Sequence, residues 1–359
     1  MPQLDSLLKQ MVELGSSDMH LAVGSPPNIR QKGELKPMGE EALDEAKLRA
    51  MLYEILSQTQ ISEFEKNWDI DFGHAAPGIA RFRGNIFMKS TGIAAVFRQI
   101  PYKILTCNQL GLPSIVEQMC DYKNGMVLVT GPTGSGKSTT LAAMIDHINA
   151  FSEEHIITLE DPIEFVQEKK KSLLSQREIG THCLSFANGL RAALREDPDV
   201  IMVGEMRDLE TIQLAMTAAE TGHLVFATLH TRNAPKTVDR IIDVFPQERQ
   251  AQIRTMLSES IRGVISQTLL KRADGQGRIG AYEILVANTG IRALIREGKT
   301  FQIGSSISTG RKEGMQSLDQ HLQELFTKGL ITADEALKAC DNPAPFQRFA
   351  TPKALAAAA

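Results

Sequence analysis

One glycine-rich segment has the residue types and spacing that suit the binding of nucleotide phosphates. Residues 131–138 read GPTGSGKS and match the pattern G-x-x-x-x-G-K-[ST]. Glycines let main-chain N–H groups converge on a β-phosphate, Lys137 can bridge the β- and γ-phosphates, and Ser138 can bind magnesium. The alternative is a glycine-rich turn without a ligand, but the apolar run MVLVT before the motif and the helical pattern after it favour nucleotide binding. The predicted nucleotide-binding residues of this segment are Gly131, Pro132, Thr133, Gly134, Ser135, Gly136, Lys137, Ser138 and Thr139.

Two acidic segments follow apolar runs that resemble strands. The run DVIMVGE ends in Glu205, the position at which P-loop enzymes place a carboxylate that holds magnesium or its water. The segment EDPIE at 160–164 follows HIITLE, and Pro162 should end that strand and turn the acids into a loop. One of these acids could polarise an attacking water as a general base. A solvated acidic turn is the alternative.

Two histidines bracket another apolar run. His223 and His230 flank LVFATL, and Thr228 and Thr231 lie close by in the sequence. A histidine at a strand end is often structural, but a strand of the nucleotide-binding sheet also suits a sensor of the γ-phosphate. No third ligand recurs at a suitable spacing, so we expect no metal site at these histidines. The four cysteines are scattered without a C-x-x-C pair, which predicts buried free thiols.

The secondary structure that must position these residues is expected to differ between the N-terminal part of the chain, up to about residue 100, and the part that follows it. The runs at 126–130, 155–160, 199–205 and 223–230 predict buried strands of a parallel sheet, so the second part is α/β. In the first part, the sequence predicts a helix from Leu4 to about Gly15, a strand at 19–23 and a hairpin at 28–37 that turns at Lys32–Gly33. A helical stretch at 44–66 and paired strands at 79–100 follow, and further helices are expected at 291–297, 317–328 and 333–339.

Composition excludes several classes of protein. The 359 residues are 42% hydrophobic and 23% charged, as in ordinary folded proteins of two or three domains. The formal net charge of -4 and the 5% aromatic content give little capacity for binding nucleic acid. No run approaches the roughly 18 apolar residues of a membrane span. The first residues lack the apolar core of a signal peptide, so we expect a cytoplasmic protein.

Six segments together resemble the secretion ATPases of the PilT/GspE superfamily. The resemblance runs from about residue 3 to 345, and within the superfamily it is greatest to the retraction ATPases of type IV pili. The segments are GPTGSGKSTTLA, TLEDPIEF, QREIG, LRAALREDPDVIMVGEMRDLETI, TGHLVFATLHT and MLSESIRGVISQTLLKR.

The resemblance implies a fold and a domain organisation. It implies an N-terminal PAS-like α+β domain at 1–100, an interdomain linker at 101–113, and a RecA-like P-loop ATPase domain with C-terminal helices at 114–345. A tail at 346–359 would follow. It also implies a homohexameric ring.

The resemblance also implies roles for individual residues. Glu164 matches the catalytic glutamate, Glu205 the acid that holds magnesium with Ser138, and His223 and His230 the histidines of the family's His box. Arg83 and Arg98 match arginines that approach the γ-phosphate, and Arg81 is a less certain third. From the sequence alone, a solvated strand face is the favoured interpretation of these arginines.

The implied function is an ATPase motor that uses ATP and Mg2+ to power type IV pilus retraction. It would act at the cytoplasmic face of the inner membrane on a pilus platform protein and, indirectly, on pilins, with no nucleic acid and with membrane association only through the pilus machine. The absence of a four-cysteine zinc module favours retraction over assembly. The segment GIRALIRE at 290–297 resembles a retraction-associated helix but departs from it at Gly290 and Ala293. Assembly or type II secretion motors and an accessory PilU-type paralogue stay open, as do a DNA translocase and a nucleotide-sensing adaptor.

Overall fold

The computed structural model describes residues 2–31, 34–100 and 104–351. The chain divides into two compact units, Met1–Lys103 with Pro162–Val166 and Ile104–Asp161 with Gln167–Ala359. Parts of three sequence-based expectations lie outside the described residues. These are the turn at Lys32–Gly33, the linker residues 101–103 and the tail residues 352–359.

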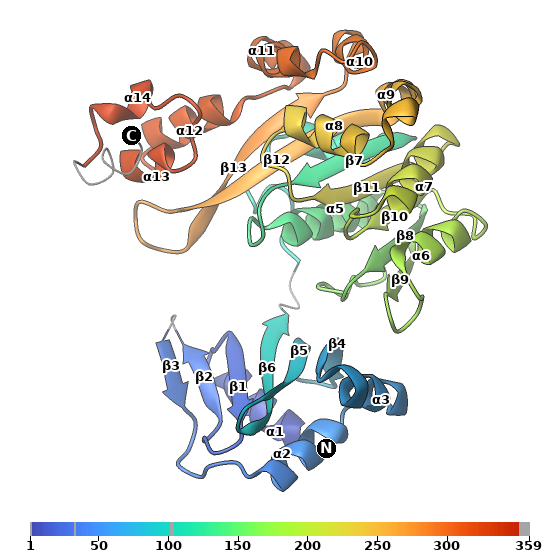
Figure 1. Cartoon of the computed structure of the whole chain (residues 1–359). Helices are drawn as coiled ribbons and strands as arrows, with labels where there is room; N and C mark the ends of the chain where they lie inside the picture. The colour runs from blue at the N-terminus through green and yellow to red at the C-terminus, as the bar shows by residue number, and fades with distance from the viewer. Residues whose placement is uncertain (1, 32–33, 101–103, 352–359) are drawn as a thin grey trace. The chain divides into compact units, whose positions relative to one another are not determined.

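The first unit is built on an antiparallel sheet of six strands in the order β3-β2-β1-β6-β5-β4 (Figure 1). The expected strand near 19–23, the hairpin and the paired strands at 79–100 are confirmed. The eight-residue strand β4 was not predicted, because only three of its side chains are buried and its sequence, DIDFGHAA, is interrupted by acids and a glycine. The strands are β1 Asp18–Ala22, β2 Asn28–Gln31, β3 Glu34–Pro37, β4 Asp69–Ala76, β5 Ala80–Lys89 and β6 Gly92–Ile100.

Three helices complete the core of the first unit: α1 Gln3–Glu13, α2 Glu45–Tyr53 and α3 Gln58–Asn67. Leu4, Leu8 and Met11 of α1 are buried in one cluster with Phe64 of α3 and the inward side chains of the sheet. The expectation of one helical stretch over 44–66 is wrong. A new helix begins after Ser57, whose hydroxyl accepts the N–H of Gln60 while the Gln60 side chain accepts the N–H of Ser57.

The second unit contains a seven-stranded sheet in the order β13-β12-β7-β11-β10-β8-β9. The four expected strands β7, β8, β10 and β11 are parallel neighbours, which confirms the α/β fold class. Strands β9, β12 and β13 were not predicted, since polar residues interrupt their apolar runs. The strands are β7 Gly125–Thr130, β8 His155–Glu160, β9 Leu173–Glu178, β10 Val200–Val203, β11 Leu224–Leu229, β12 Ile261–Lys271 and β13 Arg278–Val286.

Helices cover both faces of this sheet (Figure 1). Along β7, Val127 and Val129 pack with α4 and α5, whereas Met126 and Leu128 pack in the cluster that contains the remaining covering helices. This alternation explains why the central strands read as continuous apolar runs. The helices are α4 Ile115–Cys120 and α5 Lys137–Phe151 on one face, and α6 Phe186–Ala193, α7 Leu209–Glu220, α8 Ala234–Asp243, α9 Gln247–Ser260, α10 Thr289–Arg296 and α11 Ile303–Thr309 on the other.

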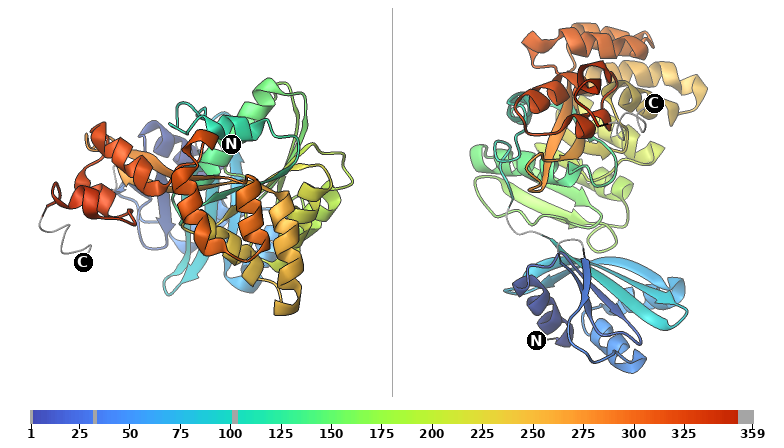
Figure 2. Two further views of the ribbon diagram at one scale, coloured as in Figure 1. Left: turned by 90° about the horizontal axis from the view of Figure 1, so that it is seen from above. Right: turned by 90° about the vertical axis from the view of Figure 1, so that its left-hand side faces the viewer.

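The C-terminal helices pack beside the β12–β13 hairpin (Figure 2). Leu270 of β12 and Ala281 of β13 share a small core with the fully buried Phe346. The helices are α12 Leu318–Thr327, α13 Ala333–Leu337 and α14 Ala344–Gln347, and the short 3-10 turns Thr300–Gln302 and Arg311–Glu313 precede them. The helices expected near 291–297, 317–328 and 333–339 are thereby confirmed. No helix within the described ranges is both long and apolar enough to cross a membrane.

Truncating a central side chain of the second unit should be strongly destabilising. Phe226 on β11 is 0% exposed, and we expect Phe226→Ala to lower the free energy of unfolding by about 3 to 5 kcal/mol through lost burial and a cavity. Phe301→Ala is the matched control, because Phe301 is 78% exposed. Thermal unfolding of both variants checks this. Equal melting temperatures for the two variants would contradict the placement of Phe226 in the core.

Candidate active site

The glycine-rich segment connects the end of β7 to the start of α5. Gly136 precedes the helix with a φ of 90°, and Lys137 is its first residue. The Lys137 ammonium donates hydrogen bonds to the carbonyl oxygens of Gly131 at 2.9 Å and Pro132 at 3.1 Å. The strand, loop and helix expected around the motif are thus all present, and the helix N-terminus adds a favourable field for an anion.

Gly131 is required by its surroundings. Its φ is +147°, and a Cβ atom there would lie 2.3 Å from the carbonyl oxygen of Gln267 and 2.6 Å from the hydroxyl of Ser135. Real Cβ atoms essentially never approach a main-chain oxygen this closely. The first glycine of the motif therefore lets the loop pass directly against strand β12.

Two polar residues of β12 hold the loop and the end of β7 that leads into it, and sequence reasoning missed both. The Gln267 amide donates to the carbonyl of Ser135 at 2.7 Å and accepts from the Thr140 hydroxyl at 2.8 Å. The Ser266 hydroxyl accepts from that of Thr130 at 2.9 Å. Gln267 is 5% exposed and Ser266 2%, so these bonds form where water cannot compete. The available signal was the polar pair inside the apolar run GVISQTLL.

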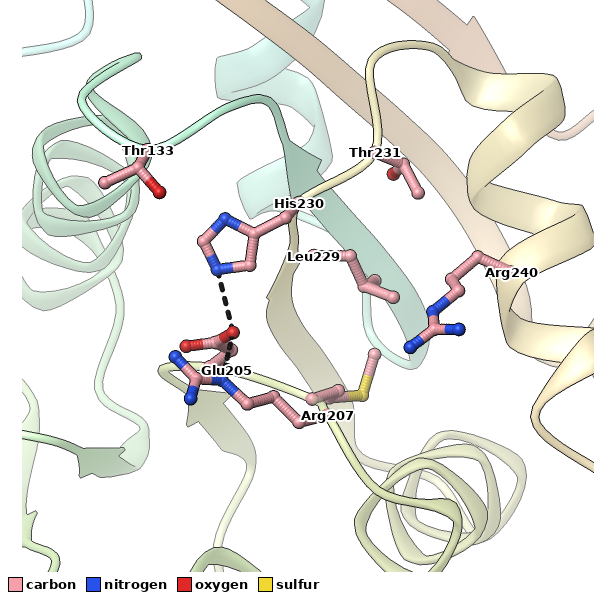
Figure 3. Close-up of a pocket in the computed structure, with 8 residues that line it drawn as sticks. Thr133, Glu205, Arg207, Leu229, His230, Thr231 and Arg240 are labelled. Atoms are coloured by element: carbon pink, nitrogen blue, oxygen red, sulfur yellow. Dashed lines mark hydrogen bonds and ion pairs between the residues drawn. The ribbon is translucent and has the colours of Figure 1, made fainter.

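Glu205 lies directly beyond β10, where the neighbouring strands fix its main chain. Gly204 donates its N–H to Leu159 at 2.8 Å and accepts the Thr228 hydroxyl at 2.5 Å. The Glu205 carboxylate atom Oε1 then contacts Nε2 of His230 at 2.7 Å and Nε of Arg207 at 2.5 Å (Figure 3). The structure therefore brings together Glu205 and His230, which the sequence separates by a helix and a strand.

The surroundings of Glu205 favour its ionised form. Partial burial disfavours the carboxylate, but the hydrogen bond from Arg207, the contact with His230 and the charge of Arg207 outweigh this, so the pKa of Glu205 is lowered. Glu205 therefore stays a carboxylate at neutral and mildly acidic pH.

A cavity of about 460 Å³ adjoins this cluster (Figure 3). Thr133 of the glycine-rich loop lies on one side and Arg240 of α8 on the other, with the Glu205–His230 pair between them. The lining residues are Thr133, Glu205, Met206, Arg207, Leu229, His230, Thr231 and Arg240.

The donor set suits Mg2+ bound together with a nucleotide. The contacts of Glu205 with Arg207 and His230 both use Oε1, which leaves the lone pairs of Oε2 for a cation or its water. A carboxylate and the hydroxyl of Ser138, completed by phosphate oxygens and waters, match the oxygen ligands that Mg2+ prefers. Among the described residues, no group of three or more His, Cys, Asp or Glu side chains forms a metal site of its own.

The acidic segment after β8 separates into a buried and a more exposed part. Glu160 ends the strand and is 8% exposed, and its carboxylate accepts hydrogen bonds from Thr158 at 2.6 Å and Gln176 at 3.0 Å. The chain then leaves the strand before Pro162, as expected. Glu164 is partly exposed and is not among the described residues that line the cavity. Its role as general base stays a prediction.

The arginines expected to approach the γ-phosphate lie on the sheet of the first unit. Arg83 and Arg98 are directly opposite each other on β5 and β6, and Arg81 lies two residues before Arg83 on the same strand. The Arg98 side chain is 71% exposed and donates to Asp18 at 2.7 Å, while Arg83 lies 3.7 Å from Asp71. Two like charges face each other here, and their role at a phosphate stays a prediction.

His223 and His230 lie at opposite ends of β11. His223 precedes the strand and contacts the carbonyl of Ala218 at 2.9 Å. The six residues Leu224–Leu229 separate it from His230, which corresponds to about 20 Å along a strand. The structure therefore does not join His223 to the glycine-rich loop of its own chain, and its part in nucleotide binding stays a prediction.

Comparisons with known proteins agree with this site. The model of the type II/IV secretion system protein family matches residues 102–338. The chain belongs to this family. It is 51% identical to the type IV pilus retraction ATPase PilT of Pseudomonas aeruginosa over 343 residues, which cover 96% of this chain and 99% of that protein. It is also 51% identical to a twitching motility protein of Neisseria gonorrhoeae over 94% of this chain and 90% of that one.

A solved structure places the whole fold in the same family. The crystal structure of the pilus retraction motor PilT with bound ADP superposes with a TM-score of 0.89 at 47% identity, and covers 96% of this chain and 99% of that one. The fold class expected from the sequence, an N-terminal α+β domain followed by a RecA-like ATPase domain, is confirmed by this match.

Substituting the first glycine of the motif should impair nucleotide binding. Because a Cβ would meet the Gln267 carbonyl and Ser135, we expect Gly131→Ala to lower affinity for ADP by about tenfold or more. Gly275→Ala is the control, since Gly275 also has a positive φ, +71°, but open space around its Cβ. Calorimetric titration with ADP checks both variants. Unchanged affinity in Gly131→Ala would contradict the contact between the loop and β12.

Proposed function

We propose that the chain is an ATP-hydrolysing motor that powers the retraction of type IV pili and so twitching motility. The observation that carries this is the 51% identity to the PilT retraction ATPase over nearly the full length of both chains. The ADP-bound relative and the intact glycine-rich loop support ATP as the nucleotide.

Each part of the site has a proposed role in hydrolysis. Lys137 and the loop amides would bind the phosphates, and Ser138 and Glu205 would hold Mg2+, which when bound would neutralise charge on the phosphate oxygens. Glu164 orients and polarises the attacking water. Arg83 and Arg98 would stabilise charge that develops on the γ-phosphate. His230 holds the Glu205 carboxylate through their 2.7 Å contact.

The proposed partners follow from the same family. The motor would be a homohexamer at the cytoplasmic face of the inner membrane, and its domain movements would act on a platform protein and thereby on pilins. An assembly or type II secretion motor and an accessory PilU-type paralogue are the alternatives within the family.

Two substitutions should separate binding from hydrolysis. We expect Lys137→Ala to abolish nucleotide binding, and Glu164→Gln to bind ATP but hydrolyse it about 10²- to 10⁴-fold more slowly, because an amide cannot accept a proton. Glu168→Gln is the matched control, since Glu168 is an exposed acid four residues later. Calorimetric titration with ATP measures binding, and phosphate release by the purified oligomer measures hydrolysis, in all three variants. A wild-type rate in Glu164→Gln would move the general base to another acid of the loop.

Deleting the gene in its host should leave cells with long, abundant pili that do not retract. Retraction should return with the wild-type chain but not with Glu164→Gln, because the variant binds ATP without turning it over. Imaging of labelled pili gives the answer. Cells without pili would show an assembly motor, and unchanged pili would show an accessory paralogue or another machine.

A further inference from the structure

Glu283 is a buried carboxylate that the proposed machinery does not use. It lies on β13, is 8% exposed, and its Oε1 accepts the main-chain N–H of Ala234 at 2.7 Å. Ala234 is the first residue of α8. A carboxylate in such a position is expensive to bury, and a neutral side chain of the same shape would avoid that cost. Its presence therefore points to a purpose other than stability.

The anchored amide lies close in the chain to the Glu205–His230 pair. After His230, the chain reaches Ala234 through only three residues, 231–233. Within this segment Thr231 contacts the Thr237 hydroxyl at 2.7 Å, and Asn233 caps α8 by accepting the N–H of Lys236 at 3.0 Å. Both His230 and Thr231 line the cavity. A bond that fixes Ala234 therefore restricts the positions that these two side chains can take.

The strand pair that holds Glu283 also holds the glycine-rich loop. Glu283 is paired across the ladder with Ser266, and the next pair is Gln267 with Tyr282. Ser266 and Gln267 make the bonds to β7, the loop and α5 described above. The β12–β13 hairpin thus contacts both sides of the site, the loop through β12 and the segment after His230 through β13.

We propose that Glu283 is a positioning residue that holds the start of α8, and through it residues His230 and Thr231, in the geometry that ATP hydrolysis requires. This inference rests on the proposed ATPase function.

The charge state of Glu283 responds to pH in the neutral range. Burial raises its pKa to about 7, the N–H of Ala234 opposes this, and the charges of Asp341 and Asp319 raise it further. Asp319 lies on α12, where His321 accepts the N–H of Tyr282. Two neighbouring elements present groups to Glu283: α8 presents the Ala234 amide, and β12 presents Ser266. Helix α11 carries no ionisable residue. The ionised form makes the stronger bond to the start of a helix.

The raised pKa of Glu283 should also make the stability of the folded chain depend on pH, which can be measured. An acid whose pKa is higher in the folded than in the unfolded chain binds more protons when folded, so stability falls as pH rises from about 4.5 through about 7. Glu283→Gln removes that penalty while it keeps a carbonyl oxygen for Ala234. It should melt at a higher temperature than the wild type near pH 8 and at about the same temperature near pH 5.

The test compares Glu283→Gln with the wild type across this pH range. We expect their kcat values for ATP to be nearly equal near pH 5, where Glu283 is protonated, and the wild type to be about fivefold to tenfold faster near pH 8 with KM unchanged. All other ionisable groups are the same in the two proteins, so their contributions cancel in the ratio. Glu248→Gln, which changes an exposed acid on α9, should follow the wild type throughout.

A second variant should shift the pH dependence of kcat while Glu283 itself is left in place. Because the Asp319 charge raises the pKa of Glu283, Asp319→Asn should shift the wild-type inflection in kcat to lower pH. The proposal is overturned if the wild type hydrolyses ATP and its ratio to Glu283→Gln is constant with pH. It is also overturned if Glu283→Gln melts at a lower temperature near pH 8, which would show a purely structural carboxylate. A wild type without ATPase activity would instead reject the proposed function.

Discussion

Parallel pairing of β8, β10, β11 and β7 is the constraint on which the rest of the second unit depends. Because these strands run in one direction, the glycine-rich loop, Glu205, His230 and the acidic segment all leave the sheet at the same edge. Helices on both faces exclude water from the strands. Water therefore does not compete for the main-chain hydrogen bonds between strands, and the strand register is fixed. The chemistry of the site is thus a consequence of strand direction.

At that edge of the sheet, a small number of buried hydrogen bonds fix the local geometry of the site. Gln267 joins the glycine-rich loop to β12, and Thr228 joins the main chain before Glu205 to β11. Each bond forms in a region of low polarity, where an unpaired donor or acceptor would be costly. The site is therefore rigid at its base, while Arg207 and His230, which are 78% and 45% exposed, remain at its surface.

Local sequence patterns predicted a large part of the fold and of the site. The glycine-rich motif, four central strands, several helices and Glu205 could be identified because each depends on neighbours within a few residues. The break at Ser57, the strands β9, β12 and β13, and the contribution of Gln267 could not. Gln267 bonds to Ser135 across 132 positions of the chain, and no local periodicity reports such a distance. A buried polar pair also weakens the apolar pattern by which a strand is recognised.

The sequence by itself determined the chemistry that is available: a phosphate-binding loop, carboxylates and histidines at strand ends, and a family resemblance specific enough to indicate the motor. Only the tertiary structure decided which of these residues meet. It placed His230 on the Glu205 carboxylate, left His223 at the far end of the same strand, and buried Glu283 against the start of α8. The reason is physical: residue type sets what a side chain can do, whereas pairing and packing between distant segments set which partners lie within reach.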